Sequence, residues 1–484
     1  MSKGVFISTA IPYVNGLPHA GHTLEFVQTD TIARYLRLQG MDVFFLSGTD
    51  ENALKNVLAA EKDDKTTKEF VDENTQHFYE LKDLLNLSFD GFIRTTEKRH
   101  FEGTQKLWNA LNPDDIYQDV YEGLYCVGCE EFKREIDLDE NGMCPEHKTK
   151  PENVKEKNYF FRLSKYQEEI KKLITDDVLK ILPEKRKNEV LGFLKAGLQD
   201  FSISRSKERA RGWGVPVPND PEQIIYVWLD ALGNYVTGLD YATDGELYKK
   251  FWFEANRRIH VIGKGIVKFH ALYWIGLLLS AKIPLPTEEF VHGYVTVEGN
   301  KIGKSLGNAI DPKLIVDKYG VDAFRYYLLR EIPAYGDGDF SWERMQEIYN
   351  SDLSNGLGNL ISRVSTLCEK YQLNLKDDNP ERNVLLDDIA PYMDKFRFNE
   401  ALKIIWGNVS GLDKYMSEQR PWQQELAEAN KTLSNIVIGM TGLRGIRDIA
   451  EALQSFMPET AEKISKQFAG ETIVKSSPLF PRLT

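Results

Sequence analysis

A chain of 484 residues with 42% hydrophobic and 28% charged residues exceeds the length that one hydrophobic core usually organises, and its composition excludes a disordered or fibrous protein. The net charge of −12 argues against indiscriminate binding to nucleic acid, so we expect basic surfaces only locally, as at residues 195–211, where a solvated loop is the alternative. The longest apolar run, ALYWIGLLLSA, is about half the length that crosses a bilayer, and the N-terminus resembles a buried strand more than a secretion signal. We therefore expect a cytoplasmic protein without membrane association.

The first fifty residues predict a strand (KGVFIST), a turn (AIPYVNGLPHAGH), a helix from Thr23 to Leu38 and a second strand (DVFFLSG). This order is typical of a parallel βαβ unit, whose first turn lies at the carboxyl edge of the sheet, where ligands bind. His19 and His22 lie at the start of the helix, where backbone amides and the helix dipole favour an anion. Their imidazoles could donate to a phosphate, and a helix cap is the alternative interpretation.

From about residue 114 to residue 215 the composition shifts to cysteine, lysine and glutamate, which indicates an insertion. This segment contains CVGC and CPEH, two pairs of potential ligands with two residues between the members of each pair. Three thiolates and one imidazole complete a tetrahedral zinc shell, and each short spacing lets one tight turn present two ligands. A chance cluster of reduced thiols is the alternative. We predict a structural zinc ion bound by Cys126, Cys129, Cys144 and His147.

Parallel strands are predicted again downstream, in IIYVWLDAL, RRIHVIG and EEFVHGYVTV, with a helix from Ile266 to Ser280. Together with the first fifty residues they predict one doubly wound, Rossmann-like α/β domain formed by residues 1–113 and 216–290. The zinc-binding insertion, residues 114–215, splits this domain.

Hydrophobic residues after about Glu343 recur every three or four positions, which predicts an α-helical bundle over residues 346–484. Cys368 lies on this apolar stripe and is expected to be a core residue. Residues 298–310, EGNKIGKSLGNAI, place two lysines in a glycine-containing loop after a strand-like alternation. Taken alone, this segment is equally well interpreted as a solvated hairpin turn.

HAGH and KIGKS together resemble the His-Ile-Gly-His and Lys-Met-Ser-Lys-Ser signatures of class I aminoacyl-tRNA synthetases. AIPYVNGLPHAGH, YVWLDALGNY, VIGKGIVKFHALYW and YGVDAFRYYLLREIP resemble the methionine branch of this class, and the cysteine knuckle is similar to that of its one-zinc, bacterial-type members. The resemblance covers nearly the whole chain. It implies a lysine-loop and stem-contact region at residues 291–345 and an anticodon-binding domain at residues 346–484.

The resemblance also implies the site residues. The catalytic residues would be His19, His22, Lys301 and Lys304. ATP, with Mg²⁺, would be bound by Tyr13, Asn15, His19, His22, Gly263, Lys301, Lys304 and Ser305. Methionine would be bound by Ile11, Asp50, Trp228, Ala231, Leu232, Tyr235, Ile266, His270 and Trp274, with the Asp50 carboxylate on the ammonium group. The tRNA anticodon would be read by Asn359, Arg363 and Trp422.

Three motifs depart from the family pattern. Asn52 and Ala53 replace the histidine and glycine of Asp-Glu-His-Gly, Gly265 replaces the aspartate of Gly-Lys-Asp, and the lysine loop has Ile302 and Gly303 in place of methionine and serine. The change at Gly265 removes a carboxylate that could hold a ribose hydroxyl.

The expected protein is a methionine-activating synthetase that uses methionine, ATP and methionine tRNA. It is expected to be a monomer, because no further module follows the helical region. One alternative is a paralogue that activates an amino acid for a small-molecule acceptor, which the departures favour and the anticodon residues oppose. Another is a non-enzymatic tRNA-binding or zinc scaffold protein, which the retained histidines and lysines oppose.

Overall fold

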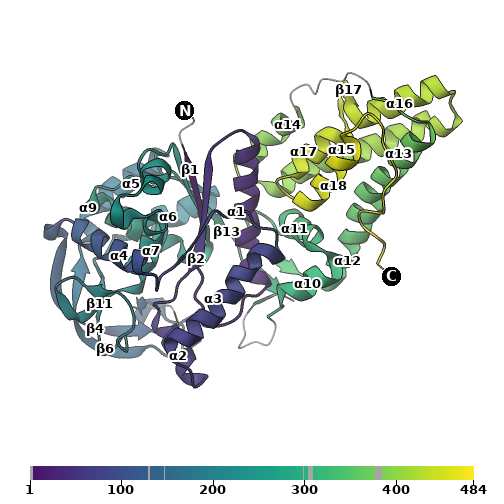
Figure 1. The fold of residues 1–484 in the computed structure, drawn as a ribbon. Helices are drawn as coiled ribbons and strands as arrows, with labels where there is room; N and C mark the ends of the chain where they lie inside the picture. Colours follow the sequence, from purple (N-terminus) through teal and green to yellow (C-terminus); the bar gives the residue numbers. More distant parts are fainter. Residues whose placement is uncertain are drawn as a thin grey trace. The chain divides into compact units, whose positions relative to one another are not determined.

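The computed structural model describes residues 4–128, 131–133, 135–145, 148–297, 299–302, 309–375 and 384–483. The chain forms two compact units (Figure 1). The first consists of Met1–Pro18, Met41–Lys82 and Ser88–Val291, and the second of His19–Gly40, Asp83–Leu87 and His292–Thr484. No described helix is both long enough and apolar enough to span a membrane.

A six-stranded sheet forms the centre of the first unit, in the order β3-β2-β1-β12-β13-β7. Its strands are β1 (Val5–Thr9), β2 (Val43–Thr49), β3 (Gly91–Arg94), β7 (Lys180–Leu182), β12 (Arg257–Gly263) and β13 (Glu288–His292). Strand β1 pairs in parallel with β2 on one side and β12 on the other, and all five of its residues are buried. This sheet confirms the predicted Rossmann-like fold. The strand order reverses between β1 and β12, the position where such sheets bind ligands.

The helices of the first unit are short and amphipathic or wholly buried. They are α2 (Leu54–Lys62), α3 (Thr67–Leu84, whose last residues enter the second unit), α4 (Lys98–Ala110), α5 (Gln167–Thr175), α6 (Glu184–Ala196), α7 (Val227–Thr237), α8 (Glu246–Tyr248) and α9 (Ile275–Ala281). A π-helix, η7 (Phe269–Trp274), precedes α9 and occupies the middle of the predicted helix Ile266–Ser280.

Residues 114–215 contribute to three sheets. An antiparallel sheet has the order β5-β4-β6-β8, with β4 (Ile116–Cys126), β5 (Glu131–Lys133), β6 (Glu152–Phe161) and β8 (Phe201–Ser202). Strand β9 (Ser204–Ser206) pairs with β11 (Asp220–Ile225), which also pairs with β10 (Pro216–Val217). Strand β7 instead joins the central sheet by pairing in parallel with β13. The predicted insertion therefore also supplies an edge strand of the central sheet.

The prediction of a parallel strand at IIYVWLDAL was wrong. Strand β11, which is antiparallel to its neighbours, ends at Ile225, and helix α7 follows with every residue buried. A helix that is buried on all sides has no polar face, so its sequence cannot be distinguished by periodicity from a buried strand. EEFVHGYVTV likewise divides into β13 and a separate strand, β14 (Val295–Val297), because the chain leaves the central sheet after His292.

The second unit begins in sequence with α1 (Ala20–Leu38). It also contains a small sheet of β14, β15 (Asn300–Lys301) and β16 (Gly338–Phe340), in the order β15-β14-β16. Strands β14 and β15 are antiparallel, with Val297 opposite Asn300, so the hairpin turn given as the alternative interpretation of residues 298–310 is present at their start. Gly299 in its turn has a φ of +73°, which glycine adopts without strain.

Helices form the rest of the second unit. They are α10 (Pro312–Tyr319), α11 (Val321–Arg330), α12 (Trp342–Ile348), the π-helix η9 (Tyr349–Gly358), α13 (Asn359–Lys370), α14 (Val384–Met393), α15 (Phe398–Gln419), α16 (Leu426–Ile438), α17 (Ile446–Leu453) and α18 (Pro458–Phe468). Figure 1 shows α13, α15, α17 and α18 gathered around a common core. A short hairpin, β17 (Gly439–Met440) and β18 (Leu443–Arg444), lies between α16 and α17.

The apolar stripe predicted for the bundle lies in its core. Leu353, Leu357, Leu360 and Val364 are fully buried, whereas Leu367, the last residue of the predicted stripe, is half-buried. Cys368 is also fully buried, and burial raises the pKa of its thiol to about 12. The helical region and the core position of Cys368 are therefore confirmed.

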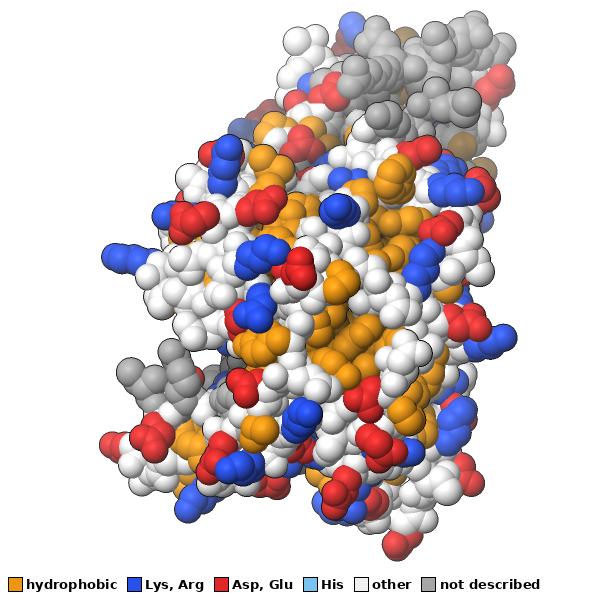
Figure 2. Space-filling view, turned by 90° about the vertical axis from the view of Figure 1, so that its left-hand side faces the viewer, with side chains coloured by type: hydrophobic (Ala, Val, Ile, Leu, Met, Phe, Trp, Pro, Cys, Tyr) orange, Lys and Arg blue, Asp and Glu red, His pale blue; other side chains and the backbone are white. Residues whose placement is uncertain are grey.

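On the face drawn in Figure 2 the charged side chains of both signs are intermixed. Lys and Arg side chains alternate there with Asp and Glu, and hydrophobic side chains lie between them (Figure 2). Such a surface suits specific local contacts better than a broad electrostatic attraction to nucleic acid.

Candidate functional site

The two histidines form the cap of helix α1. The Nδ1 atom of His19 accepts a hydrogen bond from the Gly21 amide, and the Nδ1 atom of His22 accepts one from the His19 amide, both at 3.1 Å. The rings are stacked with their centroids 3.9 Å apart. Because Nδ1 is an acceptor in each ring, the proton of each neutral imidazole lies on Nε2. The histidines are thus a helix cap, and each is also a hydrogen-bond donor at Nε2.

Two described residues of the segment 298–310, Ile302 and Ile310, lie next to this cap. The Ala20 amide donates to the carbonyl oxygen of Ile310 at 2.9 Å, and a Cβ atom placed on Gly21 would lie 3.6 Å from Cδ1 of Ile302. The structure therefore places Ile302 and Ile310, on either side of residues 303–308, beside the histidine turn within the second unit. The Lys301 side chain, Lys304 and Ser305 lie outside the described residues.

Most of the residues predicted to bind methionine lie on two segments of the first unit, among the aromatic side chains of its core (the aromatic cluster). Trp228, Ala231, Leu232 and Tyr235 lie on α7, and Ile266, His270 and Trp274 belong to the segment after β12. All but Ile266 are buried. Ile11, after β1, packs against the same hydrophobic core.

Hydrogen bonds fix the protonation state of His270. Its Nδ1 lies 2.9 Å from the carbonyl oxygen of Ile266, so Nδ1 carries the proton, and Nε2 accepts the Tyr235 hydroxyl at 2.7 Å. Burial lowers the pKa of His270 to about 4. The ring is consequently neutral near pH 7, and the cluster suits an uncharged side chain.

Two aromatic neighbours of this cluster were not predicted from the sequence. Phe269 stacks on Trp228 with ring centroids 3.7 Å apart, and His260 lies 3.9 Å from Tyr235. The Nδ1 atom of His260 pairs with the Ser8 hydroxyl at 2.8 Å, and burial lowers the pKa of His260 well below its ordinary value. Their roles depend on contacts across the sheet, so no local sequence signal marks them.

Asp50 lies beside Tyr13 beyond the ends of β1 and β2. The two residues form an isolated parallel bridge, and the Asp50 amide donates to the carbonyl oxygen of Pro12 at 2.9 Å. The Asp50 side chain is buried and accepts a hydrogen bond from the backbone amide of Asn52 at 3.3 Å. A buried carboxylate is suitable for an ammonium group.

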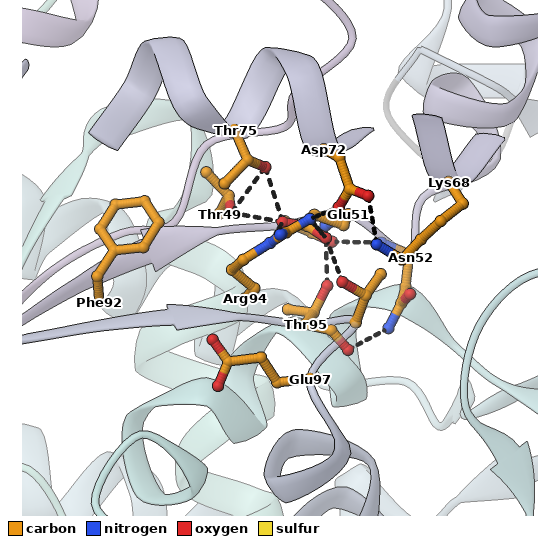
Figure 3. A network of polar contacts seen from close by, with 12 residues as sticks. Thr49, Glu51, Asn52, Lys68, Asp72, Thr75, Phe92, Arg94, Thr95 and Glu97 are labelled. Carbon is orange, nitrogen blue, oxygen red and sulfur yellow. Dashed lines mark hydrogen bonds and ion pairs between the residues drawn. The ribbon is translucent and has the colours of Figure 1, made fainter. Parts of the chain in front are cut away.

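Glu51, the next residue, is the centre of a polar network (Figure 3). Its carboxylate accepts from Nε and Nη2 of Arg94 at 2.7 and 3.0 Å and from the hydroxyls of Thr49 and Thr75 at 2.9 and 2.7 Å. The Thr96 hydroxyl also donates to it. These bonds satisfy a fully buried charge and fix the backbone next to Asp50.

Asn52, one of the departures from the family pattern, has a defined structural role. Its side-chain nitrogen, Nδ2, donates to Oδ2 of Asp230 at 2.8 Å and to the carbonyl oxygen of Thr95 at 2.9 Å. The other Asp230 oxygen lies 2.6 Å from Nε2 of His100. Asn52 thus ties the turn at Asp50 to helix α7, which carries Trp228.

The basic segment at residues 195–211 is only partly solvated. Arg205 is buried, and its guanidinium carbon lies 4.0 Å from the ring centroid of Tyr226. Arg209 lies similarly over Tyr125, at 4.3 Å. With Asn52 and Trp213 these residues line a cavity of about 30 Å³, room for one or two water molecules.

The remaining predicted site residues lie in several places. Gly263 ends β12, and Asn15 is exposed in the turn after β1. Asn359 is exposed on α13, where Arg363 bonds to Asp413 at 2.7 Å and lies 5.9 Å from the Trp422 ring. Trp422 is 41% exposed, so the structure brings Arg363 and Trp422 together at the surface.

Two of the four predicted zinc ligands can be placed. Cys126 ends β4, Cys144 lies in the loop that precedes β6, and both are buried. Cys129 and His147 fall outside the described residues. Within the described ranges no group of three or more His, Cys, Asp or Glu side chains is arranged to hold a metal ion.

Comparison with known proteins identifies the family. A family described as tRNA synthetases class I (M) matches residues 5–150 and 136–365. The methionine–tRNA ligase of Caldanaerobacter subterraneus subsp. tengcongensis is 41% identical over 96% of this chain and 74% of its own length. That of Fusobacterium nucleatum subsp. nucleatum is 39% identical over 100% of this chain and 80% of its own.

A solved structure, Mycobacterium tuberculosis methionyl-tRNA synthetase in complex with methionyl-adenylate, is 36% identical with a TM-score of 0.91, covering 99% of this chain and 100% of that one. The fold and these matches define a class I aminoacyl-tRNA synthetase. Within that class, the chain belongs to the methionyl-tRNA synthetase family.

The cap of α1 leaves no room for a side chain at its second residue. A Cβ atom on Gly21 would lie 2.9 Å from Cε1 of His19, so Gly21→Ala must displace that ring. We expect the kcat of methionine-dependent ATP–pyrophosphate exchange to fall by about tenfold to a hundredfold, since a misplacement of about 1 Å has this effect on oriented groups. Gly407→Ala on α15, where a Cβ atom meets nothing within 4 Å, is the matched control and should leave exchange unchanged. Full activity of Gly21→Ala would contradict the role of the His19 ring.

Proposed function

We propose that the chain is a methionine–tRNA ligase, which activates methionine with ATP to methionyl-adenylate and transfers the methionyl group to the 3′ end of methionine tRNA. The observation that carries this proposal is the position of Ile302 and Ile310, from the segment of the two lysines, beside the histidine cap, where the Ala20 amide donates to the carbonyl oxygen of Ile310. The relatives named methionine–tRNA ligase support it, as does the similar structure bound to methionyl-adenylate.

ATP enters with Mg²⁺, and the protein groups mainly orient it and neutralise charge. His19 and His22 donate from Nε2 to the phosphates, while Lys301 and Lys304 stabilise the charge that develops as pyrophosphate leaves. The methionine carboxylate attacks the α-phosphorus, which gives a mixed anhydride and pyrophosphate. A ribose hydroxyl of the terminal adenosine of the tRNA then attacks the anhydride carbonyl, and AMP leaves.

The aromatic cluster supplies selectivity for methionine. Trp228, Tyr235 and Trp274 give an unbranched thioether a close apolar surround, and the neutral His270 adds no charge. A charged side chain would lose its hydration there without an ionic partner. Asp50 binds the ammonium group common to all amino acids, so the cluster and not Asp50 carries the selection.

The direct test is ATP–pyrophosphate exchange measured with each of the twenty amino acids. We expect methionine to have the highest kcat/KM, and Lys304→Ala to lower its kcat by about a hundredfold, as for the loss of one donor to developing charge. A higher kcat/KM for another amino acid would favour the paralogue with a small-molecule acceptor. The departures from the family pattern at Asn52, Gly265 and Ile302 are the observations that favour this second function.

Transfer to tRNA is tested at the exposed tryptophan. Trp422→Ala removes a surface on which an unstacked anticodon base can stack, worth about 1 to 3 kcal/mol per base, so we expect tRNA charging to weaken by about tenfold to a hundredfold. Exchange without tRNA should be unchanged. Phe253→Ala, an exposed aromatic of the first unit, is the control and should alter neither activity. Equal losses of charging and exchange in Trp422→Ala would indicate a packing role instead.

We also propose the structural zinc ion. Cys126 and Cys144 are buried, and the Lys148 amide donates to the carbonyl oxygen of Cys144 at 2.8 Å. Buried thiols in tight turns fit a zinc knuckle completed by Cys129 and His147. The ion would hold the insertion in its folded form.

Metal analysis of the purified protein should therefore give about one zinc ion per chain. Cys129→Ser should lower this content and impair transfer to tRNA more than adenylate formation, because the ion lies in the insertion. Cys368→Ala, which changes a core cysteine far along the chain, should keep the zinc. A wild-type content well below one would reject the site.

The other features of the proposal are a cytoplasmic location, as for an enzyme of translation, and a monomeric state. The assignment of the segments to catalytic, insertion, stem-contact and anticodon-binding domains likewise stays a prediction.

A further inference from the structure

Arg325 on α11 is fully buried, and its guanidinium group joins three parts of the second unit. Nη2 donates to Oδ2 of Asp30 on α1 at 2.7 Å, and Nε donates to the carbonyl oxygen of Phe456, between α17 and α18, at 2.9 Å. Nη1 donates to the carbonyl oxygen of Leu85 at 3.0 Å. One side chain therefore ties the first helix of the chain to the last two.

Asp30 is held from a second direction as well. It is fully buried, and Oδ2 also accepts from Nε of Arg34 at 2.7 Å. A second nitrogen of Arg34 donates to the carbonyl oxygen of Asn86 at 2.7 Å. Helices α1 and α11 pack side by side at this point (Figure 1). Both the position of α1 along its axis and its rotation about that axis are thus fixed at Asp30.

Stability alone is a weak explanation for such a pair. Removing two charges from water costs about as much as their attraction returns, and a well-packed hydrophobic replacement is often equally stable. What the pair adds is direction, because a guanidinium group donates in a rigid planar fork. An orienting role is therefore the more informative hypothesis for Asp30 and Arg325.

The group that is oriented lies at the start of the same helix. Asp30 follows His22 by eight residues, about 12 Å along the helix axis, so a rotation of α1 at Asp30 moves both histidine rings. We propose that Arg325 and Asp30 are positioning residues for adenylate formation, which hold His19 and His22 beside Ile302 and Ile310. This inference rests on the proposed role of the two histidines with ATP.

The test is a double-mutant cycle with His22. Asp30→Asn keeps the side-chain volume and removes the charge, and Arg325→Lys keeps the charge and removes the fork. Each should lower the kcat of methionine-dependent exchange by about tenfold or more, while the KM for methionine changes by less than about twofold, since the predicted methionine residues belong to the first unit. In a His22→Ala background Asp30→Asn should lower the kcat of exchange by less than about threefold, because the His22 ring that Asp30 positions is gone.

The control is Asp317→Asn, which removes an exposed ion pair with Lys313 on α10 and should leave exchange unchanged. Near-UV circular dichroism and methionine binding show that each variant is folded. Wild-type kcat in both Asp30→Asn and Arg325→Lys would overturn the inference. An equal fold-loss for Asp30→Asn with and without His22 would also overturn it, since it would show a structural role alone.

Failure of the proposed function has a different signature. A wild-type chain without methionine-dependent exchange would refute that function, and amide hydrogen exchange then decides the placement of α1 by itself. Faster amide hydrogen exchange at residues 20–26 in Asp30→Asn, with unchanged hydrogen exchange in α15 and α16, would support the positioning role. Unchanged amide hydrogen exchange at residues 20–26 would overturn the positioning role.

Discussion

The first turn of helix α1 depends on two imidazole rings. A helix begins with backbone amides that have no partner within the helix, and here the Nδ1 atoms of His19 and His22 accept from two amides at the start of α1. The same bonds place a donor at each Nε2 and fix the two rings against each other. The fold of this turn and its proposed chemistry therefore use the same two side chains, and neither can be altered alone.

Buried polar groups fix the first unit in a comparable way. Glu51 is paired with Arg94, and Asp230 with His100 and Asn52, so the turn that carries Asp50 is bonded both to β3 and to α7. Breaking a buried pair from one side costs about 3 to 5 kcal/mol, so these contacts resist displacement. The methionine site that we propose, with an ammonium group on Asp50 beside an apolar surround, would need this rigidity, because such a site separates similar substrates by small differences in position.

Local patterns in the sequence predicted a substantial part of the fold. The strand, turn and helix around the histidines, the hairpin before Lys301 and the buried stripe from Leu353 to Val364 all have signals within a few residues of one another. Helix α7 has no such local signal, because a wholly buried helix lacks a polar face.

Local sequence patterns could not predict the contacts that organise the candidate site. Arg94 lies 43 residues after Glu51, and His100 lies 130 residues before Asp230. Nothing in the local sequence marks these pairs, because the partners meet only when the sheet has formed. The motifs predict which residues carry the chemistry, whereas the buried partners of Glu51 and Asp230 became visible only in three dimensions.

The chain alternates between the two units along its length, and this has a consequence for its synthesis. Asp30 and Arg325 are separated by 295 residues, and a ribosome that adds about 5 to 20 residues per second needs roughly 15 to 60 seconds to make that stretch. During this time the helix that carries both histidines has left the ribosome without the guanidinium group that neutralises its buried carboxylate. The nascent chain therefore cannot complete its N-terminal half first, and α1 reaches its native surroundings only late in translation.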